Sequence, residues 1–152
     1  MDNLVLIRVA AALHEELARA ILRDVREDPP HRLRLIFDGP GRVHSVAVSL
    51  RPELPWIGRP AGRRDDDRRR SGRFAATLAK ALRGTPLESV EKPTADRWLR
   101  LRFASGQTLV AELATHGANL VLLDTQGRTL VCARHPRSAR TVSYTHLTLP
   151  TN

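Results

Sequence analysis

The sequence has little cysteine and few aromatic residues, and it contains no long uncharged apolar run. Cys132 is the single cysteine, which excludes an intrachain disulfide framework and is typical of a reducing compartment. No run of about 18 apolar residues is free of charge, so no membrane span is expected. Arg8, His14 and Glu15 interrupt the apolar core that a signal peptide would need. We therefore expect a cytoplasmic protein with no membrane partner.

The aromatic fraction is 4%, whereas the hydrophobic fraction is 41%. The core is therefore expected to consist mainly of leucine, valine, alanine and isoleucine. A chain of 152 residues is long enough to bury such a core as one domain.

Arginine supplies nearly all of the positive charge, because Lys80 and Lys92 are the only lysines among 25 basic residues. A GC-rich coding sequence favours arginine codons and is one explanation for the high ratio of arginine to lysine. It does not explain the formal net charge of +9. Excess positive charge predicts a phosphate-bearing partner, either a nucleic acid or an anionic surface.

The first half of the chain predicts one helix and one β-hairpin. Asp2 is suited to cap a helix over residues 4–23. The spacing of three and four predicts that its buried stripe consists of Leu6, Val9, Leu13, Leu17 and Ile21. Residues 31–50 alternate on both sides of a Gly-Pro-Gly turn at 39–41, which indicates a hairpin. The proline-rich residues 51–56 are expected to leave the sheet.

The second half predicts a short helix followed by an antiparallel meander. Residues 58–73 contain seven arginines and three consecutive aspartates, so we expect a disordered loop there. Residues 74–82 have helical spacing, and Gly84 is placed to end that helix. Strands are expected between 87 and 133, with turns at 104–107, at 116–118 and around Gly127. The predicted fold class is α+β, with antiparallel sheets in a sandwich-like core.

The last twelve residues differ from the rest of the chain. Residues 141–152 contain no Asp, Glu, Lys or Arg and do not continue the strand pattern. They are similar to a translated sequencing-adapter peptide. We therefore expect one incomplete domain over residues 1–140, followed by a foreign tail.

No motif for enzyme chemistry is present. The six histidines are not spaced as metal ligands, and there is neither a Gly-x-Ser-x-Gly elbow nor a glycine-rich phosphate loop. The adjacent carboxylates Glu15-Glu16 and those of residues 65–67 are typical of solvated surfaces. We expect no enzymatic activity, no cofactor, no metal and no small-molecule substrate.

Arginines alternate with apolar residues on two of the expected strands. Arg97, Arg100 and Arg102 line one strand. Arg100 and Arg102 alternate there with Leu99, Leu101 and Phe103, so one face of that strand should be apolar and the other basic. Arg32 and Arg34 line a second strand in the same way. If the two basic faces adjoin, they form a patch suited to bidentate phosphate contacts. A merely solvated sheet face remains the alternative.

Several blocks of the sequence resemble the NFACT N-terminal domain, which is found in RqcH, NEMF and proteins labelled fibronectin-binding protein A. The resemblance covers about residues 1–134. It is carried, in order, by Asp2 with Leu6 and Glu16-Leu17, Leu50-Arg51-Pro52, Phe74 to Gly84 with Lys80, Asp96-Arg97, and Glu112-Leu113 with Asn119 to Asp124.

The resemblance implies a role in the rescue of stalled translation. Members bind the large ribosomal subunit and recruit alanyl-tRNA for untemplated C-terminal tailing, while the ribosome forms the bonds. The family's Asp-Arg pair, matched by Asp96-Arg97, is associated with tRNA engagement, and its N-terminal acidic residue is matched by Asp2. Arg100 and Arg102 are expected as neighbours in the same RNA-facing patch, and Lys80 as a contact from the second helix.

The chain departs from the family pattern at Ala79, Ala81 and Thr115, and the first two departures put helix-based RNA contacts in question. The resemblance also implies a fold similar to the N-terminal domain of formamidopyrimidine DNA glycosylases. Two other functions therefore stay open, a degenerate glycosylase-like nucleic-acid-binding domain and a fibronectin-binding surface adhesin. Met1-Asp2 does not supply the N-terminal proline that those glycosylases use.

Overall fold

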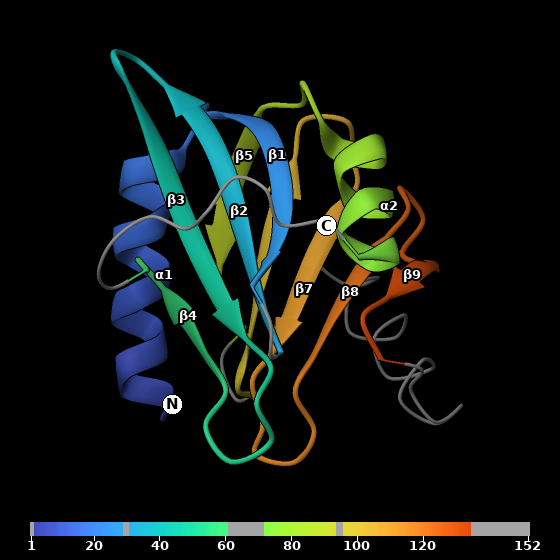
Figure 1. Ribbon diagram of the computed structural model, residues 1–152. Coiled ribbons are helices and arrows are strands. Elements are labelled where there is room, and N and C mark those ends of the chain that lie inside the picture. Colours follow the sequence, from blue (N-terminus) through green and yellow to red (C-terminus); the bar gives the residue numbers. More distant parts are fainter. Residues whose placement is uncertain (1, 29–30, 61–71, 94–95, 135–152) are drawn as a thin grey trace.

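The computed structural model describes residues 2–28, 31–60, 72–93 and 96–134. The fold is α+β, and two antiparallel sheets pack face to face with a helix at each side (Figure 1). The first sheet has the strand order β1-β2-β3-β4, and the second has the order β5-β6-β7-β8-β9. The elements are α1 (Asn3–Leu17), β1 (Ile21–Asp28), β2 (Arg32–Gly39), β3 (Arg42–Ser49), β4 (Trp56–Gly58), α2 (Arg73–Leu82), β5 (Leu87–Glu91), β6 (Trp98–Phe103), β7 (Thr108–Glu112), β8 (Asn119–Leu123) and β9 (Thr129–Cys132).

One apolar core lies between the sheets. Alternate residues of β2, such as Leu35 and Phe37, meet alternate residues of β6, such as Leu99 and Leu101, in a single buried cluster. Because side chains alternate across a strand, the intervening residues of β2 and β6 lie on the two outer faces of the sandwich. The expected sandwich-like core of aliphatic residues is confirmed.

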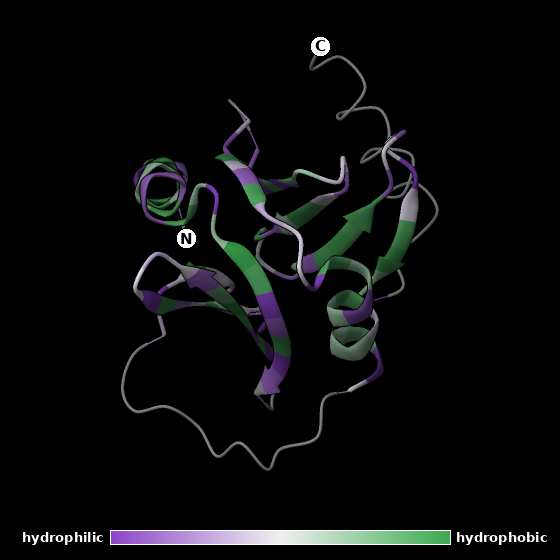
Figure 2. Cartoon of the chain, turned by 90° about the horizontal axis from the view of Figure 1, so that it is seen from above, coloured by the Kyte–Doolittle hydropathy of each residue, from purple (hydrophilic) through white to green (hydrophobic). Residues whose placement is uncertain are grey.

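The two helices close the open sides of the sandwich. α1 contacts β4 and β5, which are edge strands of different sheets, and α2 contacts β1 and β9, the two opposite edges. Viewed from above, the helices lie on either side of the layered sheets (Figure 2). Each helix therefore buries its apolar stripe in the gap that the twisted sheets leave at an edge.

The first helix is shorter than the sequence predicts. Asp2 caps it as expected, since its Oδ1 accepts a hydrogen bond from the Val5 amide at 2.9 Å. The helix ends at Leu17, however, and Arg19 has a φ of +74°, which reverses the chain. The expectation that the helix continues to residue 23 is wrong.

The residues after that reversal form β1, which the sequence analysis missed. A β-bulge shifts the register between Leu22 and Asp24, so Leu22 and Val25 both face the core although they are three residues apart. This spacing imitates a helix. Ile21, expected in the helical stripe, is 41% exposed.

The hairpin and the meander are confirmed in their order and turns. β2 and β3 pair through the turn that ends at Gly41, whose φ is +78°. Residues 51–55 lie outside the sheet as expected, but Trp56 already pairs with Ser49 and begins β4. The helix at residues 73–82 and the five strands of the second sheet match the prediction closely.

Two expectations concern residues outside the described part of the chain. They are the disordered loop, of whose residues 58–73 most are not described, and the foreign tail at 141–152. In the described part, neither helix is long and apolar enough to cross a membrane.

Candidate nucleic-acid interface

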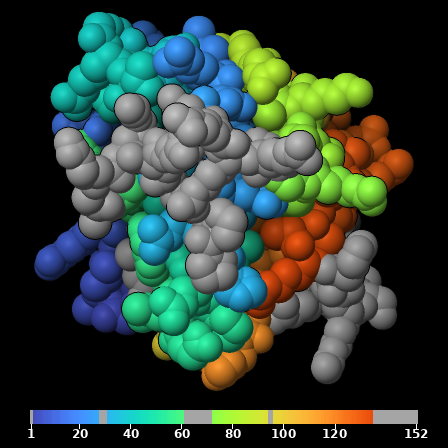
Figure 3. All heavy atoms as spheres, in the orientation of Figure 1, coloured from blue at the N-terminus to red at the C-terminus, as the bar shows by residue number. Residues whose placement is uncertain are grey.

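Three strand connections meet at the lower end of the sandwich in Figure 1, which we call the loop end. They are the described parts of the β3–β4, β5–β6 and β7–β8 connections. The His116 amide donates to the Pro52 carbonyl at 2.9 Å, and the Leu113 amide donates to the Arg97 carbonyl at 2.8 Å. The first and last connections also touch in the space-filling view (Figure 3). Backbone bonds therefore hold the loop end together.

The Asp96-Arg97 pair lies at this end, directly before β6, and both residues are exposed. The Lys92 ammonium donates to the carbonyls of Pro93 and Asp96 and so ties the β5–β6 connection to itself. Burial lowers the pKa of Lys92, an effect that the negative charge of Asp96 opposes. The Lys92 side chain thus shapes the loop that presents the pair, a role that no sequence pattern indicated.

The loop end carries charges of both signs. Arg51, Lys92 and Arg97 lie there together with the acidic residues Glu53 and Asp96. Arg51 and Arg97 are exposed, and no ion pair to either guanidinium is found among the described residues. Exposed guanidinium groups on a fixed backbone are suited to phosphate oxygens and base edges.

Asn119 fixes the end of the chain's last described segment to the loop end. Its Oδ1 accepts hydrogen bonds from the amides of Leu120 and Arg134, each at 2.9 Å, and its Nδ2 donates to the Arg134 carbonyl at 3.0 Å. Arg134 in turn donates from its guanidinium to the Leu50 carbonyl at 2.6 Å. Asn119 is fully buried, so the role of its side-chain amide is structural, and it holds Arg134 next to β8.

The outer face of β6 is not the exposed basic surface that alternation predicted. Arg100 is 9% exposed, and its guanidinium lies 2.9 Å from Glu91 and 6.0 Å from the Trp98 ring. Trp98 is buried in a second apolar cluster with Val110, Val121 and Leu123. Arg102 is more open, and it lies 3.6 Å from the same Glu91 carboxylate. One glutamate therefore offsets charge on both arginines.

The two arginine-bearing strands do not form one patch. Arg32 and Arg34 alternate with core residues of β2 and lie on the outer face of the first sheet, whereas Arg100 and Arg102 lie on the outer face of the second. The core separates these faces. Arg32 extends over the Trp56 ring at 5.5 Å, and Arg34 is only 7% exposed. The expectation of adjoining basic faces is therefore wrong.

Asp2 and Lys80 lie at different ends of the molecule. The N-terminus of α1 lies at the lower end in Figure 1, on the same side as the loop end. Lys80 is exposed in the last turn of α2, which leads into the start of β5, at the other end of that strand from Asp96. The structure therefore gathers Asp2, Asp96 and Arg97 at one end and leaves Lys80 apart from them.

A charged cluster that the sequence analysis did not foresee surrounds Glu16. The Arg59 guanidinium donates to both Glu16 oxygens, His44 Nδ1 lies 3.2 Å from Oε1, and Arg42 lies at 3.7 Å. The hydrogen bond from Arg59 is the main reason that the pKa of Glu16 is lowered, and it outweighs the effect of burial. The expectation that both adjacent glutamates are solvated is wrong for Glu16, whose side chain is 18% exposed.

Metal chemistry finds no support in the described residues, where no three His, Cys, Asp or Glu side chains lie close enough together to hold an ion. Burial raises the pKa of Cys132, so the thiol is poorly suited to act as a nucleophile.

Comparison with known proteins identifies a family and a fold. The model for NFACT N-terminal and middle domains matches residues 2–147. No curated protein matches. Among solved structures, the N-terminal domain of fibronectin-binding protein PavA from Streptococcus pneumoniae is similar at 20% identity with a TM-score of 0.81, over 90% of this chain and 57% of that one.

Two further solved structures share the fold. The N-terminal part of the fibronectin/fibrinogen-binding protein of Streptococcus suis has a TM-score of 0.79 at 16% identity, over 89% of this chain and 54% of that one. The fibrinogen-binding protein of Staphylococcus aureus has a TM-score of 0.75 at 17% identity, over 89% and 50%. The chain thus spans little more than half of these solved chains.

Proposed function

The chain belongs to the NFACT N-terminal and middle domain family, and from that membership we propose that it is an RNA-binding domain of a ribosome-associated quality-control factor. In this role it binds the stalled large ribosomal subunit and recruits tRNA, alanyl-tRNA in the bacterial case, for untemplated tailing of the nascent chain. Peptide-bond formation belongs to the ribosome, so the domain itself supplies binding and orientation.

The observation that carries the proposal is the exposed Asp96-Arg97 pair on a fixed backbone. The Arg97 carbonyl is bonded to β7 through Leu113, and the Asp96 carbonyl is bonded to Lys92, so the pair is presented with little backbone freedom. Preorganised contacts cost less ordering entropy on binding. Both side chains are exposed.

The two side chains supply complementary chemistry for RNA. The Arg97 guanidinium offers several donors in a fixed fork, which suits a phosphate or the acceptor edge of a purine. The Asp96 carboxylate accepts hydrogen bonds and suits an exocyclic amine of an unpaired base. A loop of tRNA with unstacked bases presents both kinds of group, whereas in a regular RNA duplex the Watson–Crick edges are paired and the major groove is too narrow for side chains to read.

The other candidate residues differ in how they would contribute to RNA binding. Arg51 adds positive charge at the same end, and Asp2 lies on that side of the molecule as the cap of α1. Arg102 is a peripheral contact, 40% exposed at its side chain. Arg100 is a structural residue because its guanidinium is buried against Glu91.

Fluorescence anisotropy with labelled alanine tRNA tests the proposal. Arg97→Ala is expected to weaken binding by roughly five- to a hundredfold, the range of one charged contact. Arg128→Ala is the matched control, since Arg128 is also exposed but lies in the β8–β9 turn, away from the loop end. Equal affinities for the two variants would exclude the Asp96-Arg97 pair as the site.

A second candidate comes from the solved neighbours, which are named for binding fibronectin or fibrinogen. If this chain shares that property, it should bind to immobilised fibronectin with an affinity that does not depend on Arg97. Binding of the chain to fibronectin, together with no measurable binding to tRNA, would favour this candidate over RNA binding.

A further inference from the structure

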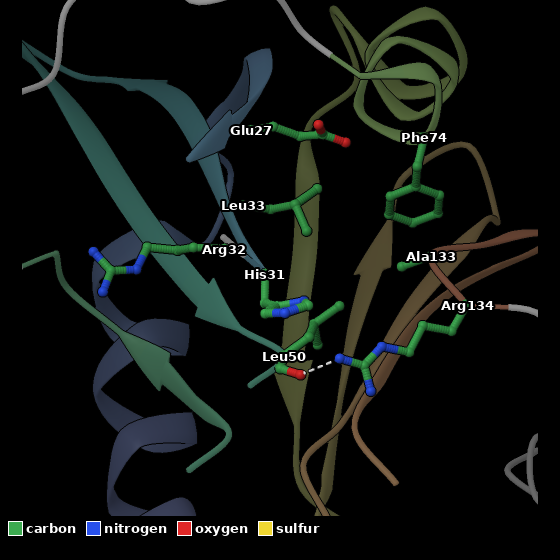
Figure 4. A pocket seen from close by; sticks show the side chains of 8 residues that line it. All are labelled: Glu27, His31, Arg32, Leu33, Leu50, Phe74, Ala133 and Arg134. Carbon is green, nitrogen blue, oxygen red and sulfur yellow. Dashed lines mark hydrogen bonds between the residues drawn. The ribbon is translucent and has the colours of Figure 1, made fainter. Parts of the chain in front are cut away.

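A pocket of ≈ 200 Å³ opens between the first sheet and the first turn of α2. Leu33, Leu50 and Ala133 supply apolar walls, and the Phe74 ring points into it from α2 (Figure 4). Its volume is below the range of about 300–1,000 Å³ that is usual for sites of drug-sized ligands. The pocket therefore suits a single ring system with its attached groups directed outward.

Two opposite charges lie at the two ends of this pocket. Glu27 lies at the end next to Phe74, and Arg134 lies at the other end beside Leu50 and His31 (Figure 4). Arg134 is anchored through its guanidinium on the Leu50 carbonyl, and its backbone is bonded to Asn119. Its remaining N–H groups are available to an acceptor or an anion.

The Glu27 carboxylate has no hydrogen-bond or ion-pair partner among the described residues, although basic side chains are plentiful in this chain. Its place is set by Gly72, where a Cβ atom would lie 2.2 Å from Oε2 of Glu27. The carboxylate thus fills the space that the missing side chain leaves. An acceptor pair that has no partner among the described residues, and that lies beside an aromatic ring in an apolar pocket, indicates a ligand that offers donors.

We propose that this pocket binds one unstacked guanine base, with its N1–H and N2–H₂ groups on the Glu27 carboxylate. The Phe74 ring contacts the base, and the attached phosphate lies outside, toward Arg134 and His31. Guanine offers two adjacent donors to a carboxylate, whereas adenine and uracil do not. The negative charge of Glu27 repels a phosphate. The nucleotide is therefore oriented with its base toward Glu27 and its phosphate toward Arg134.

The inference rests on the proposed RNA-binding function, and it adds a site distinct from Asp96-Arg97. The pocket lies beside the β1–β2 connection and α2, whereas the pair lies before β6. A guanine in a loop or at an unpaired position of an RNA would be held in this pocket. The Asp96-Arg97 pair would contact another part of the same molecule.

The test is a titration of the isotopically labelled chain with guanosine, inosine and adenosine 5′-monophosphates, followed by NMR amide shifts. Guanosine monophosphate should shift the amides of Leu33, Phe74 and Ala133. Inosine lacks only the N2 amine, so its monophosphate should bind at least about fivefold more weakly, because one charge-assisted hydrogen bond is lost. Similar affinities for all three nucleotides would overturn the proposal.

Three variants test whether the Glu27 carboxylate is the group that selects guanine. Glu27→Gln should abolish the preference for guanine over hypoxanthine. Gly72→Ala keeps the charge of Glu27 but forces its carboxylate aside. It should therefore weaken the binding of guanosine monophosphate by at least about fivefold, as the loss of the N2 amine does. Glu88→Gln removes an exposed glutamate of β5 and should have no effect. A Glu27→Gln variant that keeps the wild-type preference, with a native amide spectrum, would contradict the proposal.

The same proteins assayed with tRNA separate the two proposals. Binding of tRNA that depends on Arg97, together with no selectivity among the nucleotides, would refute the pocket alone. Selective binding of guanosine monophosphate with no binding of tRNA would refute the proposed function and leave a nucleotide pocket.

Discussion

Glu16 lies where α1 meets β3 and β4, and it links three elements through its carboxylate. Arg59 and His44 contact it directly, and Arg42 lies within ion-pair distance. Because Arg59 and Arg42 are largely exposed, salt and solvent weaken their share of the interaction. His44 is 10% exposed at its side chain, so its contact with Glu16 is the better shielded one.

Glu16→Gln is expected to lower the free energy of unfolding at pH 7 by about 1–3 kcal/mol, as for other hydrogen bonds to charged groups. The pKa of Glu16 is lowered in the folded state, so its contribution is present above the ordinary glutamate pKa of about 4.3 and is lost as the pH falls through the lowered value. The gap between wild type and variant should therefore shrink in urea denaturation below about pH 4.

The matched control for this measurement is Glu15→Gln, since Glu15 is exposed on the same turn of α1. It should change stability by less than about 0.5 kcal/mol at either pH. A pH-independent gap for Glu16→Gln would contradict the assignment of its stabilisation to the charged carboxylate.

Arg100 and Arg102 show why position on a strand does not by itself make an arginine a ligand contact. Both can reach Glu91, but the Arg100 guanidinium is buried and that of Arg102 is not. Double-mutant cycles with Glu91→Gln should give a coupling energy of about 1–3 kcal/mol for Arg100 and below about 1 kcal/mol for Arg102.

These energies are measured by urea denaturation of the single and double variants. Equal coupling for the two arginines would contradict the structural role assigned to Arg100. If Arg100→Ala were stable and weakened tRNA binding, that arginine would instead belong to the RNA-binding surface.

At the scale of elements, β1 is the part of the fold that the sequence concealed. Its bulge places Leu22 and Val25 on the same face at a spacing typical of a helix, directly after a true helix. The strands of the second sheet could be predicted because they are short apolar runs separated by clear turns, and because apolar and charged residues alternate in β6. Local spacing identified those strands, whereas the bulged strand is defined only by its pairing with β2.

The position of β1 makes a sharp prediction about two adjacent residues. Leu22→Ala should cost about 2–5 kcal/mol of stability, because Leu22 is fully buried. Ile21→Ser should cost less than about 1 kcal/mol, because Ile21 is 41% exposed. Chemical denaturation of both variants tests this directly, and the reverse order would support the longer helix.

At the scale of the molecule, the two helices close the sides of the sandwich and leave its loop end open. The candidate pair could be found in the sequence only through the family resemblance, because Asp96-Arg97 has no distinctive local pattern. The contacts of Asn119 and Arg134 that hold the loop end in place could not be found from the family resemblance. Asn119 is 15 residues from Arg134, and Leu50 is 84 residues from it, so their contacts exist only in the folded chain.

The same reasoning explains the error about the basic patch. Alternation predicts which residues share one face of a strand, but it does not predict which faces of two sheets adjoin. Face-to-face packing placed the arginines of β2 and β6 on opposite outer faces. Folding thus places the exposed residues Arg51 and Arg97 at the loop end, away from the outer faces that carry the arginines of β2 and β6.

The central claim is that Arg97 at the loop end contacts tRNA, and the salt dependence of tRNA affinity tests it most directly. Each phosphate contact contributes close to one unit to the slope of log affinity against log salt concentration. Arg97→Ala should therefore lower the magnitude of that slope by about one unit, while Arg128→Ala leaves it unchanged. Identical slopes for wild type and Arg97→Ala, with a native fold, would contradict the account.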